Sequence, residues 1–390
     1  MKRAIFAMAL GTFALGTAEF SMMGVLSDVA ADMGVSISRA GDFISTYALG
    51  VSVGAVALLG MQRMSLRTVL AALAAIIFVG NLAAGMAQGY GMLMAARFVA
   101  GLPHGCFFGA GAIAAQRIAP PGRGALAVAT MVAGMSVSTV TSVPLATWLA
   151  TVTTWRWAFF IAAAFGLAAT VCLLAFMPAI HTDESGARVT MTSQFRFLRS
   201  PAPWLIFGAV FFGQASIYCW YTYIEPMMTT VTGVSSSVMT WVMIVAGTGF
   251  IVGGLGAGRL SDRHSPSLVV SWLCVAAAAV LALSVVAAHC APVMVALTFA
   301  ATAILFGIGG PLQYLIIRFA RGGEMLGGAM IQMAFNLSNA LSAWLGGTAI
   351  TLAAHSSFAL PPLLAPALVG IPLALVALAL TMRLHSRYDR

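Results

Sequence analysis

The scarcity of charged side chains constrains this chain more than any other feature of its sequence. Asp, Glu, Lys and Arg together make up 7% of the 390 residues, against about 25% in typical soluble domains. Apolar residues make up 61%, and the mean hydropathy is +0.99. So few charged residues cannot form the water-exposed surface of a soluble protein, so nearly every segment must lie in lipid. The sequence therefore predicts an all-α membrane protein that crosses the bilayer many times.

Apolar segments bounded by charged or turn residues predict twelve transmembrane helices. Each is long enough to cross a hydrocarbon core of about 30 Å, which takes roughly 20 helical residues. If the N-terminus is cytoplasmic, the C-terminus is cytoplasmic too, because the number of crossings is even. The predicted spans cover residues 4–26, 41–61, 68–88, 92–115, 125–149, 157–178, 203–225, 238–258, 268–289, 293–317, 326–350 and 361–382.

The basic residues indicate this orientation. With both termini cytoplasmic, all of the 19 Lys and Arg residues except Arg39, Arg97 and Arg156 fall in cytoplasmic segments. This asymmetry is the positive-inside pattern of membrane proteins. The net charge of +9 is thereby explained by topology. It does not indicate a nucleic-acid partner, because the chain has no basic run with interleaved aromatic residues.

A polar stretch in the middle of the chain divides the predicted spans into six plus six. Sliding one half onto the other at a constant offset matches Gly34 with Gly233 and Gly50 with Gly249. Such a parallel repeat is typical of transporters that place their substrate site between two halves. The predicted organisation is an N-terminal six-helix bundle (residues 1–178), a cytoplasmic linker (179–202) and a C-terminal six-helix bundle (203–390).

The remaining composition excludes several classes of function. The five cysteines show no Cys-x-x-Cys and no metal-ligand spacing, so they are interpreted as small core residues and no metal site is predicted. The chain has no nucleophile elbow and no phosphate-binding loop, so we expect neither an enzyme nor a cofactor. A multipass receptor or membrane enzyme is the alternative outside transport.

The apolar N-terminal segment resembles a secretory signal, but it continues past Glu19 to Leu26. We therefore expect this segment to be retained as the first span.

Ionisable side chains inside predicted spans are costly in lipid, so each one suggests a function. Glu19 in the first span and Arg97 in the fourth lie at matching depths, roughly 7 to 11 Å below the outer surface of the hydrocarbon core. One interpretation is a static charge pair that ties these spans together. The other is a carboxylate that exchanges a proton or a substrate as a cavity opens to alternate sides of the membrane.

His104 shares a helix face with Arg97. Histidine titrates in a range that suits proton coupling. It can equally donate a hydrogen bond to a backbone carbonyl, such as the one that Pro103 frees. The sequence leaves both interpretations open.

The seventh predicted span carries a continuous polar stripe. Its members are Gln214, Tyr218, Tyr221 and Glu225, which recur at gaps of four, three and four. Aromatic hydroxyls and an amide suit a polar organic ligand, and Gln214 and Tyr218 lie too deep for an interfacial aromatic belt. We therefore expect these two side chains to line a substrate cavity, and Glu225 to lie at its outer mouth.

Amide side chains form a second stripe, in the eleventh predicted span, made of Gln332, Asn336 and Asn339. These amides either join neighbouring helices by hydrogen bonds or line a water-filled cavity. We add Gln313, in the tenth span, to the candidate substrate residues.

Short stretches along the whole chain match the pattern of one transporter family. They are residues 16–20 (GTAEF), 96–105 (ARFVAGLPHG), 197–204 (FLRSPAPW), 223–226 (YIEP), 334–337 (AFNL) and the loop 258–263 (GRLSDR). In these stretches the chain resembles the major facilitator superfamily, and within it the drug:proton antiporter 1 branch with its sugar-efflux and AraJ-type transporters. The first copy of the loop signature, residues 59–63, departs from the pattern because Arg63 stands in the aspartate position.

The resemblance implies a function as well as a fold. It implies a bacterial inner-membrane transporter that exports small polar or amphipathic solutes by proton antiport and alternating access. The substrates would be sugars such as arabinose or its derivatives; the alternative is a polyspecific chloramphenicol-type drug exporter or a nucleoside exporter. Arg97 matches the arginine that the family uses in proton coupling, and Gly258, Asp262 and Arg263 match its cytoplasmic gating motif. The expected partners are substrate, protons and the lipid bilayer, and a monomer is expected.

Overall fold

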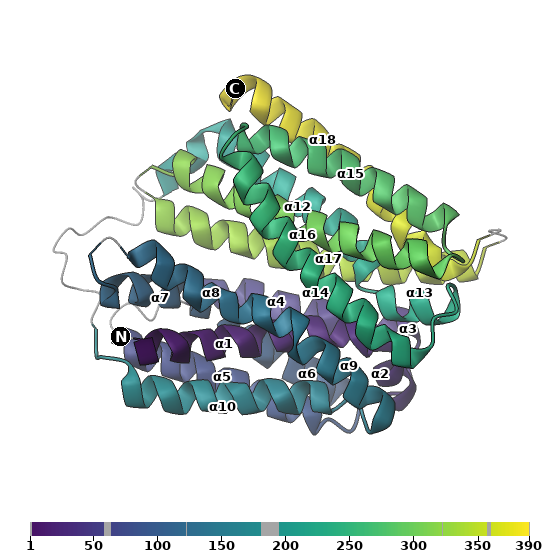
Figure 1. The fold of residues 1–390 in the computed structure, drawn as a ribbon, viewed down its shortest axis with the longest axis horizontal. Helices are drawn as coiled ribbons and strands as arrows, with labels where there is room; N and C mark the ends of the chain where they lie inside the picture. Colours follow the sequence, from purple (N-terminus) through teal and green to yellow (C-terminus); the bar gives the residue numbers. More distant parts are fainter. Residues whose placement is uncertain are drawn as a thin grey trace. The chain divides into compact units, whose positions relative to one another are not determined.

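The computed structural model describes residues 2–57, 64–121, 123–180, 195–321, 323–356 and 360–389. Within these ranges the regular elements are α-helices and short 3₁₀ helices, and no strand occurs (Figure 1). The eroded loop signature and most of the predicted linker lie outside the described residues. The helices group into two compact units, and each is described by itself. Unit 1 comprises Met1–Asp28 and Thr46–Arg188, and unit 2 comprises Val29–Ser45 and Val189–Arg390.

Helix α1 is the central helix of unit 1. It packs against α8 and α10, and it is the most deeply buried of the candidate spans. The helix is interrupted at Leu102, between α6 and α7, because Pro103 lacks the N–H that would continue the helical hydrogen bonds. The helices of this unit are α1 (Lys2–Phe20), η1 (Ser21–Gly24), α4 (Asp42–Ala57, which begins in unit 2), α5 (Leu66–Gly85), α6 (Tyr90–Gly101), α7 (Pro103–Ile118), α8 (Gly124–Val140), α9 (Ser142–Val152) and α10 (Trp157–Phe176).

Helix α12 has the corresponding place in unit 2, where it packs against α16, α17 and α18. Helix α16 contains Pro311 without ending there. Helix α2 (Leu26–Asp32) joins the two units. The other helices of unit 2 are α3 (Ile37–Ala40), η4 (Phe195–Arg199), α12 (Pro201–Tyr221), α13 (Ile224–Thr230), α14 (Ser236–Ser261), α15 (Pro266–Val286), α16 (Ala291–Phe319), α17 (Glu324–Ala354), η5 (Pro362–Leu364) and α18 (Ala365–Tyr388).

Two glycines that the predicted internal repeat matches, Gly34 and Gly233, share one backbone conformation. Gly34 has a φ of 64° and Gly233 a φ of 78°, and they are the only residues with positive φ in the described part of the chain. Each precedes an extended serine, Ser36 or Ser235, that begins the next helix. Because the left-handed conformation favours glycine, the same turn in both halves explains why the glycine recurs at the matched position.

Ten helical segments in the described residues are long and apolar enough to cross a membrane. They correspond to ten of the predicted spans. Of the other two, the span 41–61 runs into undescribed residues, and the span 326–350 lies in α17, whose 31 residues carry the amide stripe. The total of twelve crossings and the side on which the termini lie therefore stay predictions.

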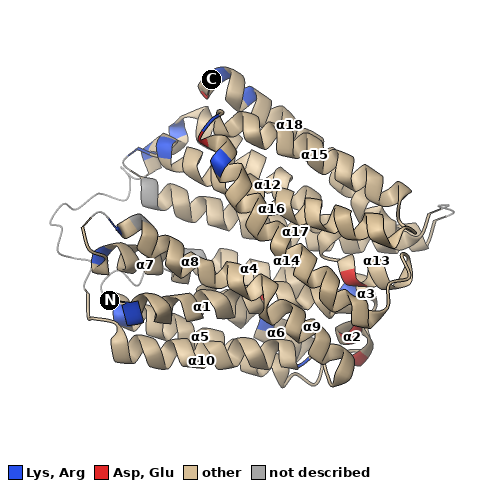
Figure 2. Cartoon of the chain, viewed as in Figure 1, with Lys and Arg blue, Asp and Glu red and all other residues tan. Residues whose placement is uncertain are grey.

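The outer surface of the helices is apolar, as lipid requires. Val286, Trp241 and Leu352 are 85%, 67% and 66% exposed. Exposed apolar surface of this kind marks contact with lipid or with another protein. In unit 2, basic residues instead gather at one end of the helices, where α12 begins and α18 ends (Figure 2).

Candidate functional site

The ionisable residues predicted for proton coupling lie together inside unit 1. Glu19 near the end of α1, Arg97 on α6 and His104 on α7 are 6%, 0% and 6% exposed. The His104 Nε2 atom lies 3.8 Å from Glu19 Oε2. Arg97 lies within electrostatic range of Glu19, and its Nη1 donates a hydrogen bond to the carbonyl of Ala18 at 2.7 Å. The fold thus brings three residues from three helices to one buried place.

Tyr47 on α4 completes this group, and the sequence analysis did not select it. Its hydroxyl lies 2.9 Å from His104 Nδ1, so it donates or accepts a hydrogen bond according to the imidazole tautomer. The guanidinium carbon of Arg97 lies 4.3 Å from the centre of the Tyr47 ring, a cation–π contact. We call Glu19, Tyr47, Arg97 and His104 the buried polar cluster. A signal was present in the sequence, because Tyr47 is the one tyrosine of the predicted span 41–61.

Local structure explains how these side chains are held. Pro103 begins α7, which places His104 in its first turn beside the break after α6. Phe108, one turn later, stacks on the imidazole with ring centroids 5.3 Å apart. Phe159 of α10 also lies near Arg97, with its ring centre 5.5 Å from the guanidinium carbon. Aromatic rings from two helices therefore pack against the charged side chains.

The buried polar cluster is able to hold and pass a proton. A carboxylate only accepts hydrogen bonds and a guanidinium only donates them, whereas tyrosine and neutral histidine do both. A proton added to Glu19 or His104 changes which of their contacts are donors and which are acceptors. Both the charge-pair and the proton-exchange interpretations use these same atoms.

The polar stripe of the seventh span lies along α12 and α13 and is buried. Gln214 Nε2 donates to the Leu305 carbonyl of α16 at 2.8 Å, so this amide joins two helices. The Tyr221 ring meets Phe250 of α14 edge to face at 5.6 Å. Tyr218 and Glu225 are also buried, and Glu225 accepts hydrogen bonds from Thr229.

The amide stripe lies on α17. Asn336 and Asn339 are buried and Gln332 is half-buried. Asn336 Nδ2 donates to the Gln332 carbonyl at 3.0 Å, so the two residues are joined through one turn of their own helix. Gln313 of α16 is half-buried and lies against Gly328 of α17.

Tyr223 is a second residue whose contacts the sequence analysis did not predict. It is fully buried between α13 and α17, and its hydroxyl donates to the Ala343 carbonyl at 2.6 Å. Ser38, which flanks it, donates from Oγ to the Gly347 carbonyl and accepts a hydrogen bond from Thr351 at 2.8 Å. These bonds fasten the segment Val29–Ser45 to α17 within unit 2.

The three residues predicted to act in gating lie at the end of α14. Gly258 is in its last turn, Asp262 follows the helix, and Arg263 is in the turn before α15. All three are exposed. No group of His, Cys, Asp and Glu residues in the described ranges is arranged to hold a metal ion.

Long apolar helices with an apolar outer surface are typical of a polytopic membrane protein. Residues 8–343 match the Major Facilitator Superfamily. The chain therefore belongs to this superfamily, which confirms the resemblance, and it is a multipass membrane transporter rather than an enzyme.

Several curated proteins are similar over nearly their whole length. AraJ of Escherichia coli (strain K12), which is named as a transporter, is 39% identical over 100% of this chain and 96% of its own length. The inner membrane transport protein YdhP of Escherichia coli O157:H7 is 33% identical over 95% of this chain and 94% of its own. A chloramphenicol resistance protein of Streptomyces lividans is 30% identical over 96% of this chain and 95% of its own.

Solved structures share the fold at low sequence identity. A single-site mutant of the nucleoside transporter NupG superimposes with a TM-score of 0.76 at 11% identity, over 98% of this chain and 99% of its own. A D-xylose-proton symporter superimposes with a TM-score of 0.73 at 15% identity, over 96% of each chain. At such identities the similarity concerns the fold alone.

Proposed function

We propose that this chain is a proton-coupled exporter of small polar or amphipathic solutes in the bacterial inner membrane. The observation that carries the proposal is the buried polar cluster, because a carboxylate, an imidazole and a guanidinium in one buried place need a functional reason. The relatives support the location, since YdhP is named as an inner membrane protein.

In the proposed cycle, which works by alternating access, residues 1–178 and 203–390 form two six-helix bundles and residues 179–202 connect them. Glu19 takes up a proton from the outer side, with Arg97, His104 and Tyr47 adjusting to its charge. Substrate binds the polar side chains of the second bundle, namely Gln214, Tyr218, Tyr221, Gln313, Gln332, Asn336 and Asn339, with Glu225 at the outer mouth. The exporter works as a monomer, and Gly258, Asp262 and Arg263 act in cytoplasmic gating.

Sugars such as arabinose are the first substrate class, because amides and hydroxyls match the hydrogen-bonding edges of a polyol. The second candidate is a chloramphenicol-type drug, and the observation in its favour is the 30% identity to the Streptomyces resistance protein.

Proton flux in everted membrane vesicles tests the proposal. In vesicles with an acid interior, adding substrate should release protons from the lumen and dissipate the pH gradient. We expect the variant Glu19→Gln to lose this response, because an amide cannot exchange the proton, while it retains exchange of labelled substrate for unlabelled substrate. Running the assay with arabinose and with chloramphenicol distinguishes the two substrate classes.

The matched control is Asp32→Asn, which neutralises an exposed acid at the end of α2. It should behave like the wild-type chain in both assays. Undiminished proton release by Glu19→Gln would show that Glu19 does not carry the proton.

A further inference from the structure

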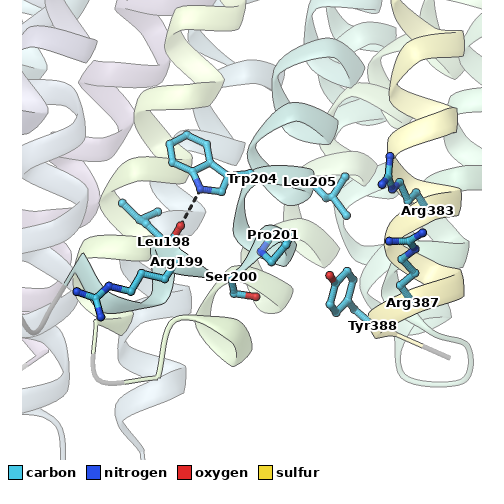
Figure 3. Close-up of a pocket in the computed structure, with 9 residues that line it drawn as sticks. All are labelled: Leu198, Arg199, Ser200, Pro201, Trp204, Leu205, Arg383, Arg387 and Tyr388. Atoms are coloured by element: carbon cyan, nitrogen blue, oxygen red, sulfur yellow. Dashed lines mark hydrogen bonds between the residues drawn. The ribbon is translucent and has the colours of Figure 1, made fainter.

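A pocket of about 460 Å³ opens in unit 2, away from the buried polar cluster and the two polar stripes. Its walls come from η4, the first turns of α12 and the last turns of α18 (Figure 3). This is the end of unit 2 where the basic residues gather, on the side that the arginine distribution predicts to be cytoplasmic (Figure 2).

Two arginines from one helix form the cationic wall of the pocket. Arg383 and Arg387 lie one turn apart on the same face of α18, and both are exposed. Neither guanidinium forms a hydrogen bond or an ion pair with any described residue, and no acidic residue lines the pocket. Like charges one turn apart repel each other, so an anion between them would stabilise the pair.

The opposite face of α18 is held by its own partners. Asp389 is 3% exposed; its carboxylate pairs with Arg318 at 3.1 Å and accepts a hydrogen bond from the Ser267 N–H at 3.0 Å. His385 Nδ1 lies 2.8 Å from Ser265 Oγ. These contacts fix the end of α18 on α15 and α16. They also occupy Asp389, the acid nearest in sequence, so it is not available to neutralise the arginine pair.

The floor of the pocket adds groups that bind phosphate oxygens. Ser200 precedes α12 without capping it, and Pro201 is the first helical residue. The positive end of the α12 dipole lies at this floor and favours an anion. Pro201 and Pro203 carry no N–H, and the Ser200 N–H donates to the Phe197 carbonyl at 3.1 Å, so the polar groups of the floor are side-chain hydroxyls. Figure 3 shows Ser200 and Tyr388, each with a hydroxyl, at this floor, one at the start of α12 and the other at the end of α18. In the same view the guanidinium of Arg199 points away from the Arg383 and Arg387 pair.

The remaining wall is apolar and lies where a membrane surface is expected. Trp204 is 57% exposed, and its Nε1 donates to the Leu198 carbonyl at 2.8 Å, which holds the ring against η4 (Figure 3). Tryptophans with one polar end are typical of the boundary between lipid headgroups and hydrocarbon. A cationic wall beside an exposed apolar wall matches a molecule with an anionic head and an apolar tail.

We propose that this pocket binds a phosphate group, held by Arg383 and Arg387 over the start of α12. Its source is either the headgroup of an anionic phospholipid or a soluble phosphate, and the exposed Trp204 favours the lipid. The site is independent of the proposed transport cycle, so failure of one proposal leaves the other standing.

Native mass spectrometry of the purified, delipidated full chain tests the proposal. The first phosphatidylglycerol molecule should bind roughly 10- to 30-fold more weakly to the double variant Arg383→Gln/Arg387→Gln than to the wild-type chain, because each arginine near an anionic headgroup contributes a comparable share. The charge-conserving variant Arg383→Lys/Arg387→Lys should keep most of the affinity. A melting curve for each variant shows that it is folded.

The control is Arg321→Gln, which removes an exposed arginine of the same unit outside the pocket. It should change the affinity by less than about twofold, since screening weakens distant charges. Equal binding of phosphatidylglycerol by the Gln double variant and the control would overturn the proposal. Equal binding of diacylglycerol, which lacks phosphate, by the wild-type chain would overturn it too.

Two further arms identify the source of the phosphate. If inorganic phosphate at millimolar concentration displaces phosphatidylglycerol from the wild-type chain, the pocket binds soluble phosphate as well. If only the lipid binds, with the same dependence on Arg383 and Arg387, the source is the membrane.

Discussion

At the scale of single residues, the buried polar cluster combines side chains with different hydrogen-bonding capacities. Glu19 only accepts while ionised, Arg97 only donates, and Tyr47 and His104 adapt to either neighbour. Tyr47 has two separable roles, because its hydroxyl meets His104 Nδ1 while its ring face meets the Arg97 guanidinium. A change at the hydroxyl alone therefore tests the proposed proton coupling without removing the ring that packs on the arginine.

We expect Tyr47→Phe to keep the fold and to alter coupling. Losing one hydrogen bond costs about 0.5–1.5 kcal/mol, while the ring still packs on Arg97. Transport in vesicles should slow and its dependence on pH should shift, because His104 loses the partner of Nδ1. The measurements are the melting temperature and the initial transport rate across a pH series.

Tyr47→Ala is the comparison for that prediction. It removes the ring as well, and truncation of a buried aromatic side chain costs about 3–5 kcal/mol, so it should lower the melting temperature clearly more than Tyr47→Phe. An unchanged pH profile in a folded Tyr47→Phe protein would show that the hydroxyl has no part in coupling.

At the scale of elements, α1, which carries Glu19 near its end, packs closely against α8 and α9. Thr12 Oγ1 donates to the Met131 carbonyl at 2.6 Å, and the hydroxyls of Thr17 and Ser142 lie 2.5 Å apart. Gly134 permits this approach, because a methyl group there would overlap the Ala9 carbonyl and the Thr12 hydroxyl. Small residues at such contacts are how membrane helices come close enough to pack.

Gly134→Ala should separate α1 from α8 and destabilise the protein by about 1–3 kcal/mol, as overpacking does. The matched control is Gly254→Ala in α14, where an added methyl group meets no atom within 4 Å. Because alanine favours a helix more than glycine does, the control should leave the melting temperature unchanged or raise it. Equal melting temperatures for the two variants would contradict the close approach at Gly134.

At the scale of the whole molecule, the scarcity of charge and the placement of the arginines predict how the chain lies in the membrane. The native cysteines provide a test, because Cys290 is exposed, Cys172 is half-buried and the other three are buried. Cys290 follows the ninth predicted span, so it is predicted to be on the outer side.

A membrane-impermeant maleimide should therefore label Cys290 in right-side-out vesicles and not in inverted ones. The variant Cys290→Ser should abolish the label, which serves as the control. Labelling in inverted vesicles alone would show that the predicted orientation is reversed.

Much of the fold followed from local sequence. The shortage of charge and the lengths of the apolar segments predicted membrane helices, because a lipid environment allows few other solutions. Glu19, Arg97 and His104 were selected as single residues for the same reason. The breaks in these helices were less predictable, as at Leu102 and Thr141, because a proline or a polar residue in a membrane helix interrupts it only in some packing contexts.

The sequence by itself determined that this chain is an all-helical member of the Major Facilitator Superfamily, since hydropathy, spacing and short motifs are local properties. Only the tertiary structure decided which side chains meet. Tyr47 joins His104 and Arg97, Tyr223 joins α17, and the arginine pair of α18 lies over the start of α12. These contacts depend on how distant helices pack, and helical periodicity shows which face a residue occupies but not which helix lies against it.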